Sequence, residues 1–153
     1  MTSYSSSSAK SLVVYFSATG TTARAAQRIA RETGADLYRI EPERAYTAAD
    51  LDWRNARSRS SVEMNDPNAR PAIRREPTVD LSPYDTVYLG YPIWWDLAPR
   101  IVNTFVESHP ELKGKTVIPF ATSGSSSIAN SVAELKRSYP SLDWQSGRLM
   151  NGR

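Results

Sequence analysis

The 153-residue sequence has no cysteine and a single histidine. Without cysteine it can form no disulfide, thiolate zinc site or cysteine-ligated iron–sulfur cluster, and it has no cysteine nucleophile. No apolar run approaches the roughly 20 residues of a membrane span. The Ser-rich residues 1–10 lack the apolar segment of a signal peptide. We therefore expect a cytoplasmic protein without a membrane partner, with a disordered lead at residues 1–10 and one folded domain at 11–153.

Acidic residues are slightly outnumbered, with 16 Asp and Glu against 19 Lys and Arg and a net charge of +3. The excess lies in residues 44–75, where seven arginines face four acidic residues. We interpret this segment as a solvated surface, with a docking patch for an acidic partner or a phosphate as the less favoured alternative. The arginines are not interleaved with aromatic residues as in nucleic-acid-binding modules, so we expect no nucleic acid partner.

The stretch at residues 12–32 organises the chain. Leu12 to Phe16 is apolar and rich in β-branched and aromatic residues, which predicts a buried strand. A hydroxyl-rich loop with one glycine follows at residues 17–22, and residues 23–32 have apolar positions at helical spacing. A helix start behind such a loop suits a phosphate. The alternative is an ordinary capped turn. Neither the P-loop motif G-x-x-x-x-G-K-[ST] nor the dinucleotide-binding motif G-x-G-x-x-G is present.

Strand and helix patterns alternate along the rest of the chain, which predicts a doubly wound parallel α/β sheet. The single histidine, His109, falls in a polar loop, where we expect it to be solvated. Outside an expected helix at 48–60, residues 41–82 read as extended loop. The expected strands are 12–16, 36–40, 86–91, 115–121 and an interrupted one around 142–149; the expected helices are 23–32, 48–60 with Thr47 as its cap, 100–107 and 128–139.

Three loops follow strands at the edge of the sheet where ligands bind in such folds. The loop at 17–22 can take a phosphate, the loop at 92–99 holds two adjacent tryptophans, and the Gly/Ser loop at 122–127 offers backbone N–H groups. A phosphate together with a flat heteroaromatic ring indicates a nucleotide or a flavin.

The same loops resemble those of the flavodoxin family. Ser17-x-Thr19-Gly20-x-Thr22 is similar to its S/T-x-T-G-x-T phosphate loop. Tyr91-Pro-Ile-Trp-Trp95 resembles the Tyr-Pro-x-Trp-Trp loop of one bacterial branch, and Phe120-Ala-Thr-Ser-Gly124 resembles that branch's third loop. The resemblance covers residues 11–150. It implies a five-stranded parallel sheet in the order 2-1-3-4-5, with helices on both faces, and one non-covalently bound FMN.

The resemblance also implies which residues bind the cofactor. No catalytic side chain and no metal ligand is implied. One of the two adjacent tryptophans is expected to be in the core, and the sequence leaves open which one stacks on the ring. The phosphate residues would be Ser17, Thr19, Gly20, Thr21 and Thr22; the ring would be lined by Pro92, Ile93, Trp94 and Trp95; its polar edge would meet Thr122, Ser123 and Gly124.

The chain departs from the family pattern in three respects. Asp96 stands where many relatives have glycine, and its carboxylate would disfavour negative charge on a reduced flavin. The chain is basic, whereas electron-carrying flavodoxins are often acidic. The family's last helix should follow Met150, but the sequence given ends at Arg153. We therefore expect an exposed apolar groove beside the first helix, covered by a second copy in a homodimer or, less favoured, by residues 1–10.

These observations favour an FMN-dependent electron carrier that exchanges electrons with a redox partner protein or a small-molecule acceptor. Two alternatives remain at this point. The first is an NAD(P)H-dependent quinone or nitro reductase using FMN, with arginines of the 44–75 segment serving a 2′-phosphate. The second is a flavodoxin-like scaffold without a working cofactor.

Overall fold

The computed structural model describes residues 10–74, 79–123 and 127–150. Its centre is a parallel sheet in the order β3-β2-β4-β5-β6, with β7 also paired to β5. The predicted order is confirmed, and the last strand is interrupted as expected, so that six short strands replace five. The strands are β2 Ser11–Tyr15, β3 Asp36–Arg39, β4 Thr86–Pro92, β5 Thr116–Thr122, β6 Asp143–Trp144 and β7 Arg148–Leu149.

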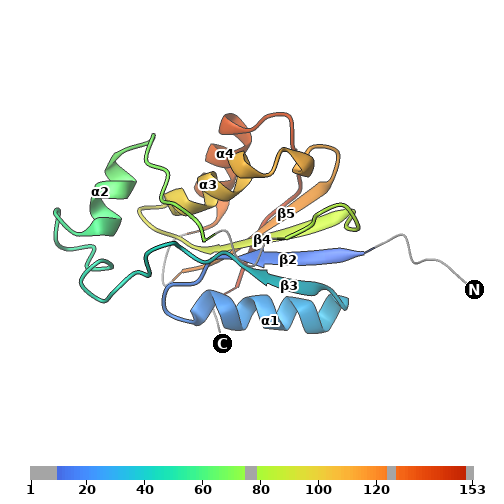
Figure 1. Cartoon of the computed structure of the whole chain (residues 1–153), viewed down its shortest axis with the longest axis horizontal. Coiled ribbons are helices and arrows are strands. Elements are labelled where there is room, and N and C mark those ends of the chain that lie inside the picture. The colour runs from blue at the N-terminus through green and yellow to red at the C-terminus, as the bar shows by residue number, and fades with distance from the viewer. Residues whose placement is uncertain (1–9, 75–78, 124–126, 151–153) are drawn as a thin grey trace, which may run out of the picture.

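Helices lie on both faces of the sheet (Figure 1). α1 (Thr21–Thr33) covers one face, while α3 (Arg100–Ser108) and α4 (Ala129–Ser138) cover the other. α2 (Arg59–Asn65) stands apart from both layers, and a short 3-10 turn, η1 (Pro110–Leu112), follows α3. Because both faces are covered, the central strands are apolar on both sides, as is usual in parallel sheets.

The two faces of β2 supply two separate cores. Val13 and Tyr15 pack with the apolar face of α1, while Leu12, Val14 and Phe16 point to the α3 side. On the α1 side β4 passes directly beneath the ring of Phe120. A Cβ placed at Gly90 would lie 2.1 Å from that ring, so only glycine fits there.

The apolar groove expected beside the first helix is filled. Val13 and Phe120 are 0% exposed and Met150 is 5% exposed. Met150 is held by its N–H, which donates to the Ala121 carbonyl at 2.6 Å. The homodimer was predicted from an exposed groove, and that exposure is wrong for Val13, Phe120 and Met150. Oligomeric state stays a prediction, which light scattering can test.

The helix predicted over 48–60 is wrong, because side chains compete with the helical hydrogen bonds. Thr47 does cap one turn, since its hydroxyl accepts from the Asp50 N–H at 3.1 Å. The carboxylate of Asp52 then accepts from Arg54 N at 3.2 Å, and Asn55 Oδ1 accepts from Arg57 N at 2.9 Å. Such local bonds favour turns over helix. The helix begins only at Arg59 and runs into the segment predicted as loop.

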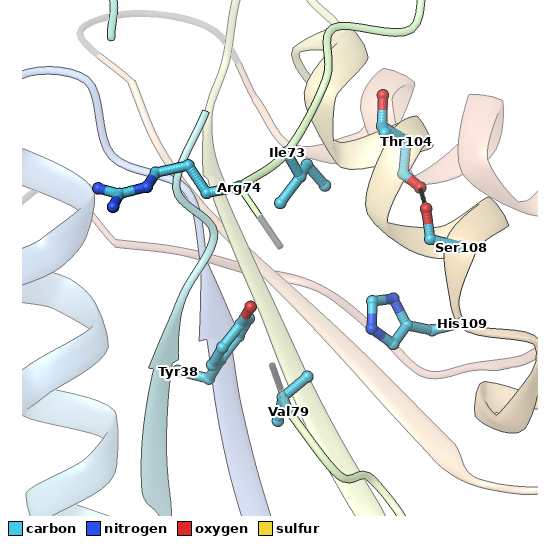
Figure 2. Close-up of a pocket in the computed structure, with 7 residues that line it drawn as sticks. All are labelled: Tyr38, Ile73, Arg74, Val79, Thr104, Ser108 and His109. Carbon is cyan, nitrogen blue, oxygen red and sulfur yellow. Dashed lines mark hydrogen bonds between the residues drawn. The ribbon is translucent and has the colours of Figure 1, made fainter. Parts of the chain in front are cut away.

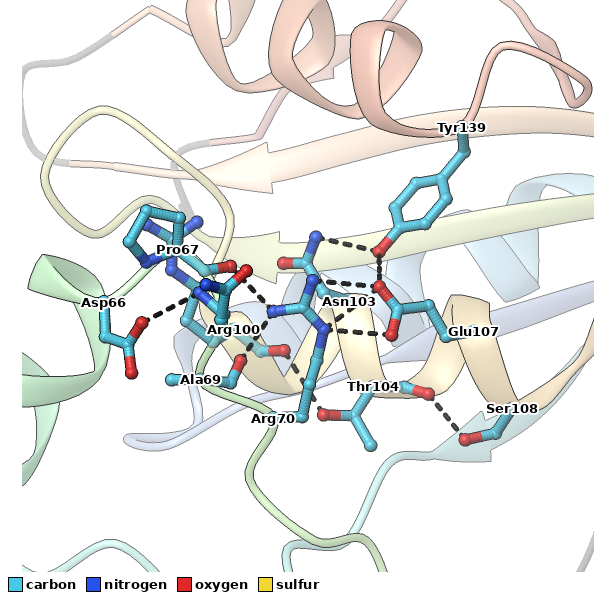
Figure 3. Close-up of polar contacts among 11 residues, drawn as sticks. Asp66, Pro67, Ala69, Arg70, Arg100, Asn103, Thr104, Glu107, Ser108 and Tyr139 are labelled. Carbon is cyan, nitrogen blue, oxygen red and sulfur yellow. Dashed lines mark hydrogen bonds and ion pairs between the residues drawn. The ribbon is translucent and has the colours of Figure 1, made fainter.

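An ion pair fastens the long connection between β3 and β4 to the α3 face (Figure 3). Arg70 Nε donates to both carboxylate oxygens of Glu107 at 3.0 Å, and Tyr139 of the α4 end donates to the same carboxylate at 2.5 Å. The guanidinium holds the pKa of Glu107 below its usual value. Nearby, buried Arg100 donates to the Met64 carbonyl at 2.9 Å. Arg100 thus fastens the carboxyl end of α2 to the first residue of α3.

Candidate functional site

Hydrogen bonds join the three loops at the carboxyl edge of the sheet. The hydroxyls of Thr22 and Thr122, one hundred residues apart, lie 2.7 Å from each other and are buried. The N–H of Ile93 donates to the Thr122 carbonyl at 3.0 Å. Thr122 at the end of β5 thus connects Thr22, in the first turn of α1, with Ile93, in the loop after β4. These two predicted residues meet at Thr122.

The first loop has the geometry of an anion cradle. Gly20 adopts a left-handed conformation with φ 98°, and its N–H donates to Ser17 Oγ at 3.0 Å. No side chain caps α1 at Gly20, and the first helical bond runs from Arg24 N to the Gly20 carbonyl at 3.1 Å. The N–H groups of residues 21–23 therefore have no acceptor within the helix. Ser17 and Thr22 are buried, and Thr19 is exposed.

The second loop turns back on itself within two residues. Trp94 and Leu97 exchange backbone hydrogen bonds of 2.9 and 3.0 Å, leaving Trp95 and Asp96 at the tip. Both tip residues have positive φ, 48° and 66°, as in a type I′ turn. Glycine suits such positions, and aspartate tolerates them better than most residues. This explains why glycine was expected at position 96.

The two tryptophans have different surroundings. The Trp94 ring meets Phe16 at 5.8 Å and Tyr46 at 5.4 Å, both edge-to-face. Trp95 is 44% exposed. Trp94 is half-buried and packs against the core, whereas the Trp95 ring is the more exposed of the two. Pro92 and Ile93, which precede them, are half-buried.

The third loop is described only in part. Thr122 is buried and Ser123 is half-buried. Gly124, also predicted to meet the ring edge, lies outside the described residues.

A polar cluster of Tyr46, Arg59 and Glu63, which was not predicted from the sequence, contacts Trp94 through the Tyr46 ring. Tyr46 donates to Glu63 Oε1 at 2.6 Å, and Arg59 pairs with Glu63 Oε2 at 2.9 Å. The Arg59 guanidinium also lies 3.8 Å from the centre of the Tyr46 ring. Burial raises the pKa of Tyr46 far above its usual value, and the bond to Glu63 raises it further. The i,i+4 spacing of Arg59 and Glu63 was the signal available in the sequence.

A separate pocket lies away from these loops, on the α3 side of β3 (Figure 2). It has a volume of about 390 Å³ and is lined by Tyr38, Arg74 and His109, among others. His109 was expected to be solvated, but its ring stacks on Phe105 at 4.1 Å and its Nδ1 lies 2.8 Å from the Phe105 carbonyl. None of the predicted site residues lines this pocket.

Neither a metal-binding cluster nor a membrane-spanning helix is found among the described residues. No group of three or more His, Asp or Glu side chains there is placed to hold a metal ion. Nor does any helix within residues 10–74, 79–123 and 127–150 combine the length and apolarity that crossing a bilayer requires.

Comparison with known proteins now decides the family. Residues 10–153 match the family model described as Flavodoxin. The chain belongs to the flavodoxin family. Within the sequence of this flavodoxin, the three loop motifs that carried the resemblance all fall inside the matched range. No curated protein matches the chain.

Solved structures similar to this flavodoxin include two from Bacteroides, each named a "putative flavoprotein". The one from Bacteroides eggerthii DSM 20697 is 63% identical with a TM-score of 0.90, covering 94% of this chain and 89% of that one. The one from Bacteroides uniformis ATCC 8492 is 58% identical with a TM-score of 0.90, covering 94% and 91%.

A more distant neighbour is the flavoprotein from Lactobacillus acidophilus NCFM in complex with FMN. It is 20% identical with a TM-score of 0.76, covering 92% of this chain and 93% of that one. At this identity the likeness shows the shared fold alone.

Proposed function

We propose that this flavodoxin binds FMN at the carboxyl edge of its sheet and acts as an electron carrier. The observation that carries the proposal is the joining of three sequence-distant loops through Thr22, Thr122 and Ile93. The FMN complex of the Lactobacillus neighbour supports the choice of ligand.

The residues present fit the phosphate end of FMN. The uncapped start of α1, with left-handed Gly20 before it, directs backbone N–H groups to one place. Thr19 and Thr21 add hydroxyl donors there. Residues 17–22 contain no carboxylate that would repel an anion.

The fit extends to the ring. Trp95 offers an exposed indole face at the tip of a tight turn, and such a face stacks on a flat ring. Backbone groups of the third loop, from Thr122 onward, would bond its polar edge. Asp96 beside the stacking residue adds a negative charge, which disfavours an anionic reduced ring.

FMN, when bound, supplies the redox chemistry, because it accepts and releases electrons itself. The chain's own residues then bind it, orient it and set its electrostatic surroundings. This division of roles needs no general acid or base, which agrees with the lack of a catalytic constellation in the sequence. The exchange partner is a redox protein or a small-molecule acceptor.

The first experiment measures flavin binding. Purified protein is titrated with FMN and with riboflavin while the flavin fluorescence is followed. We expect FMN to bind much more tightly. Thr19→Ala should weaken FMN by about 1–3 kcal/mol, the value of hydrogen bonds to a charged group, and leave riboflavin nearly unchanged. Equal binding of the two flavins by the wild type would show that the loop is not a phosphate site.

The second experiment tests the electron-carrier role. Holoprotein is reduced chemically and mixed with a one-electron acceptor, and in parallel the oxidised form is mixed with NADPH. We expect rapid reoxidation by the acceptor and no direct NADPH oxidation. Turnover of NADPH by the purified protein would overturn the carrier role while leaving FMN binding intact.

A further inference from the structure

Two guanidinium groups flank the proposed phosphate loop. Arg24 Nη2, from the first turn of α1, lies 3.4 Å from Thr21 Oγ1. Its Nη1 lies 3.6 Å from the place that a Cβ on Gly20 would occupy. Arg39, at the end of β3, donates from Nη2 to the Ser17 carbonyl at 2.7 Å. The two cations thus reach both ends of the loop.

The charge around the loop is mainly of one sign. Arg24 is exposed, and among the described residues no carboxylate pairs with it. Arg39 has one acidic neighbour, Glu41, whose Oε1 lies 3.7 Å from Arg39 Nε. Both of these side chains are about two-fifths exposed, at 41% and 45%. Glu41 therefore offsets part of the positive charge at one end of the loop only.

We propose that Arg24 and Arg39 make ligand recognition depend on charge, so that they select a flavin bearing a phosphate over riboflavin. The inference rests on the proposed function, because it assigns residues to the same site. A phosphate monoester carries a charge of about −1.5 to −2 at neutral pH. Backbone N–H groups and hydroxyls donate to it but carry no net charge, whereas a guanidinium supplies both charge and donors.

Arg24 has the larger role of the two. Its guanidinium adjoins the Thr21 hydroxyl, so an anion held by that hydroxyl lies within its reach. Arg39 acts on the loop through the Ser17 carbonyl and shares its charge with Glu41, which makes it mainly a positioning residue. Because both side chains are exposed, salt should weaken their effect.

The test compares FMN and riboflavin affinity by fluorescence titration at low salt, near 10 mM, and at 1 M NaCl. Arg24→Gln should weaken FMN about tenfold at low salt, as expected for a charged hydrogen-bonding partner. The loss should shrink severalfold at 1 M, where the Debye length falls to about 3 Å. Riboflavin affinity should stay unchanged in both conditions.

Variants at three further positions provide matched comparisons. Arg28→Gln removes the same charge from the same helix, one turn further from the loop, and should leave FMN affinity within twofold. Glu41→Gln should strengthen FMN binding severalfold at low salt, because it removes the negative charge that offsets the charge of Arg39. Arg39→Gln should weaken FMN less than Arg24→Gln does. Arg39→Lys, which keeps the charge, replaces it if Arg39→Gln lowers the melting temperature.

The outcomes separate the two proposals. Equal losses for Arg24→Gln and Arg28→Gln would mean a general charge effect and would overturn the inference. An unchanged FMN affinity in Arg24→Gln would overturn it as well, while FMN binding by the wild type would still stand. If the wild type binds neither flavin, the proposed function itself is wrong.

Discussion

Replacing each of the two adjacent tryptophans in turn should separate folding stability from flavin contact. Trp94 makes two edge-to-face contacts, with Phe16 and Tyr46. Each such pair contributes about 0.5–1.5 kcal/mol beyond the area buried, so the two are worth about 1–3 kcal/mol. Loss of the buried part of the indole adds to this, since burying apolar area yields about 25 cal/mol per Å². We expect Trp94→Ala to lower the free energy of unfolding by about 3 kcal/mol.

Trp95→Ala should change stability much less, by no more than about 1 kcal/mol, because the ring is 44% exposed. Its φ of 48° costs any L-residue about 1–2 kcal/mol. Trp95→Gly relieves that strain and should be more stable than Trp95→Ala.

The assays are urea unfolding of the ligand-free proteins and emission of bound FMN. Trp95→Ala should bind FMN with partly restored emission, because the quenching ring is gone. Trp94→Ala should keep the emission quenched in whatever fraction remains folded. Restored emission in Trp94→Ala together with full quenching in Trp95→Ala would refute the assignment of the two rings.

Substitutions at three other places test the fold. Gly90→Ala should destabilise by about 1–3 kcal/mol through overpacking against Phe120, and Phe120→Leu in the same chain should recover part of the loss in thermal unfolding. Ser58→Ala should cost about 1 kcal/mol, because Ser58 caps α2. Ser60→Ala should cost nothing, since Ser60 is 2% exposed and its buried hydroxyl has no hydrogen-bond partner among the described residues. Glu107→Gln should reduce stability slightly at pH 7. Because the Arg70 bond lowers the folded-state pKa of Glu107, this difference is fully present above the unfolded pKa of about 4.3. In urea titrations it should be lost as the pH falls from there through the lower folded-state pKa.

The sheet could be predicted from the sequence because its signals are local. The apolar runs of β2, β4 and β5 and the apolar positions of α1 each follow a regular period, and the observed bounds differ from the predicted ones by one or two residues. The first loop could be predicted for the same reason, since strand, glycine and helix start adjoin in the chain.

Features that depend on contacts between distant residues could not be predicted. The choice between Trp94 and Trp95 depends on Tyr46, which comes from a connection with no regular pattern. The helix expected over 48–60 failed because Asp52 and Asn55 form turns, an outcome that composition alone does not reveal. The filling of the groove beside α1 by Met150 required the pairing of β7 with β5.

The Thr22–Thr122 contact also limits when the site can exist during synthesis. At about 5–20 residues per second, the ribosome needs about 5–20 s to add the 100 residues between the two threonines. For that interval the nascent chain lacks the third loop, although the second loop is complete once residue 99 has been added. The proposed FMN site can therefore form only in chains that have already added β5.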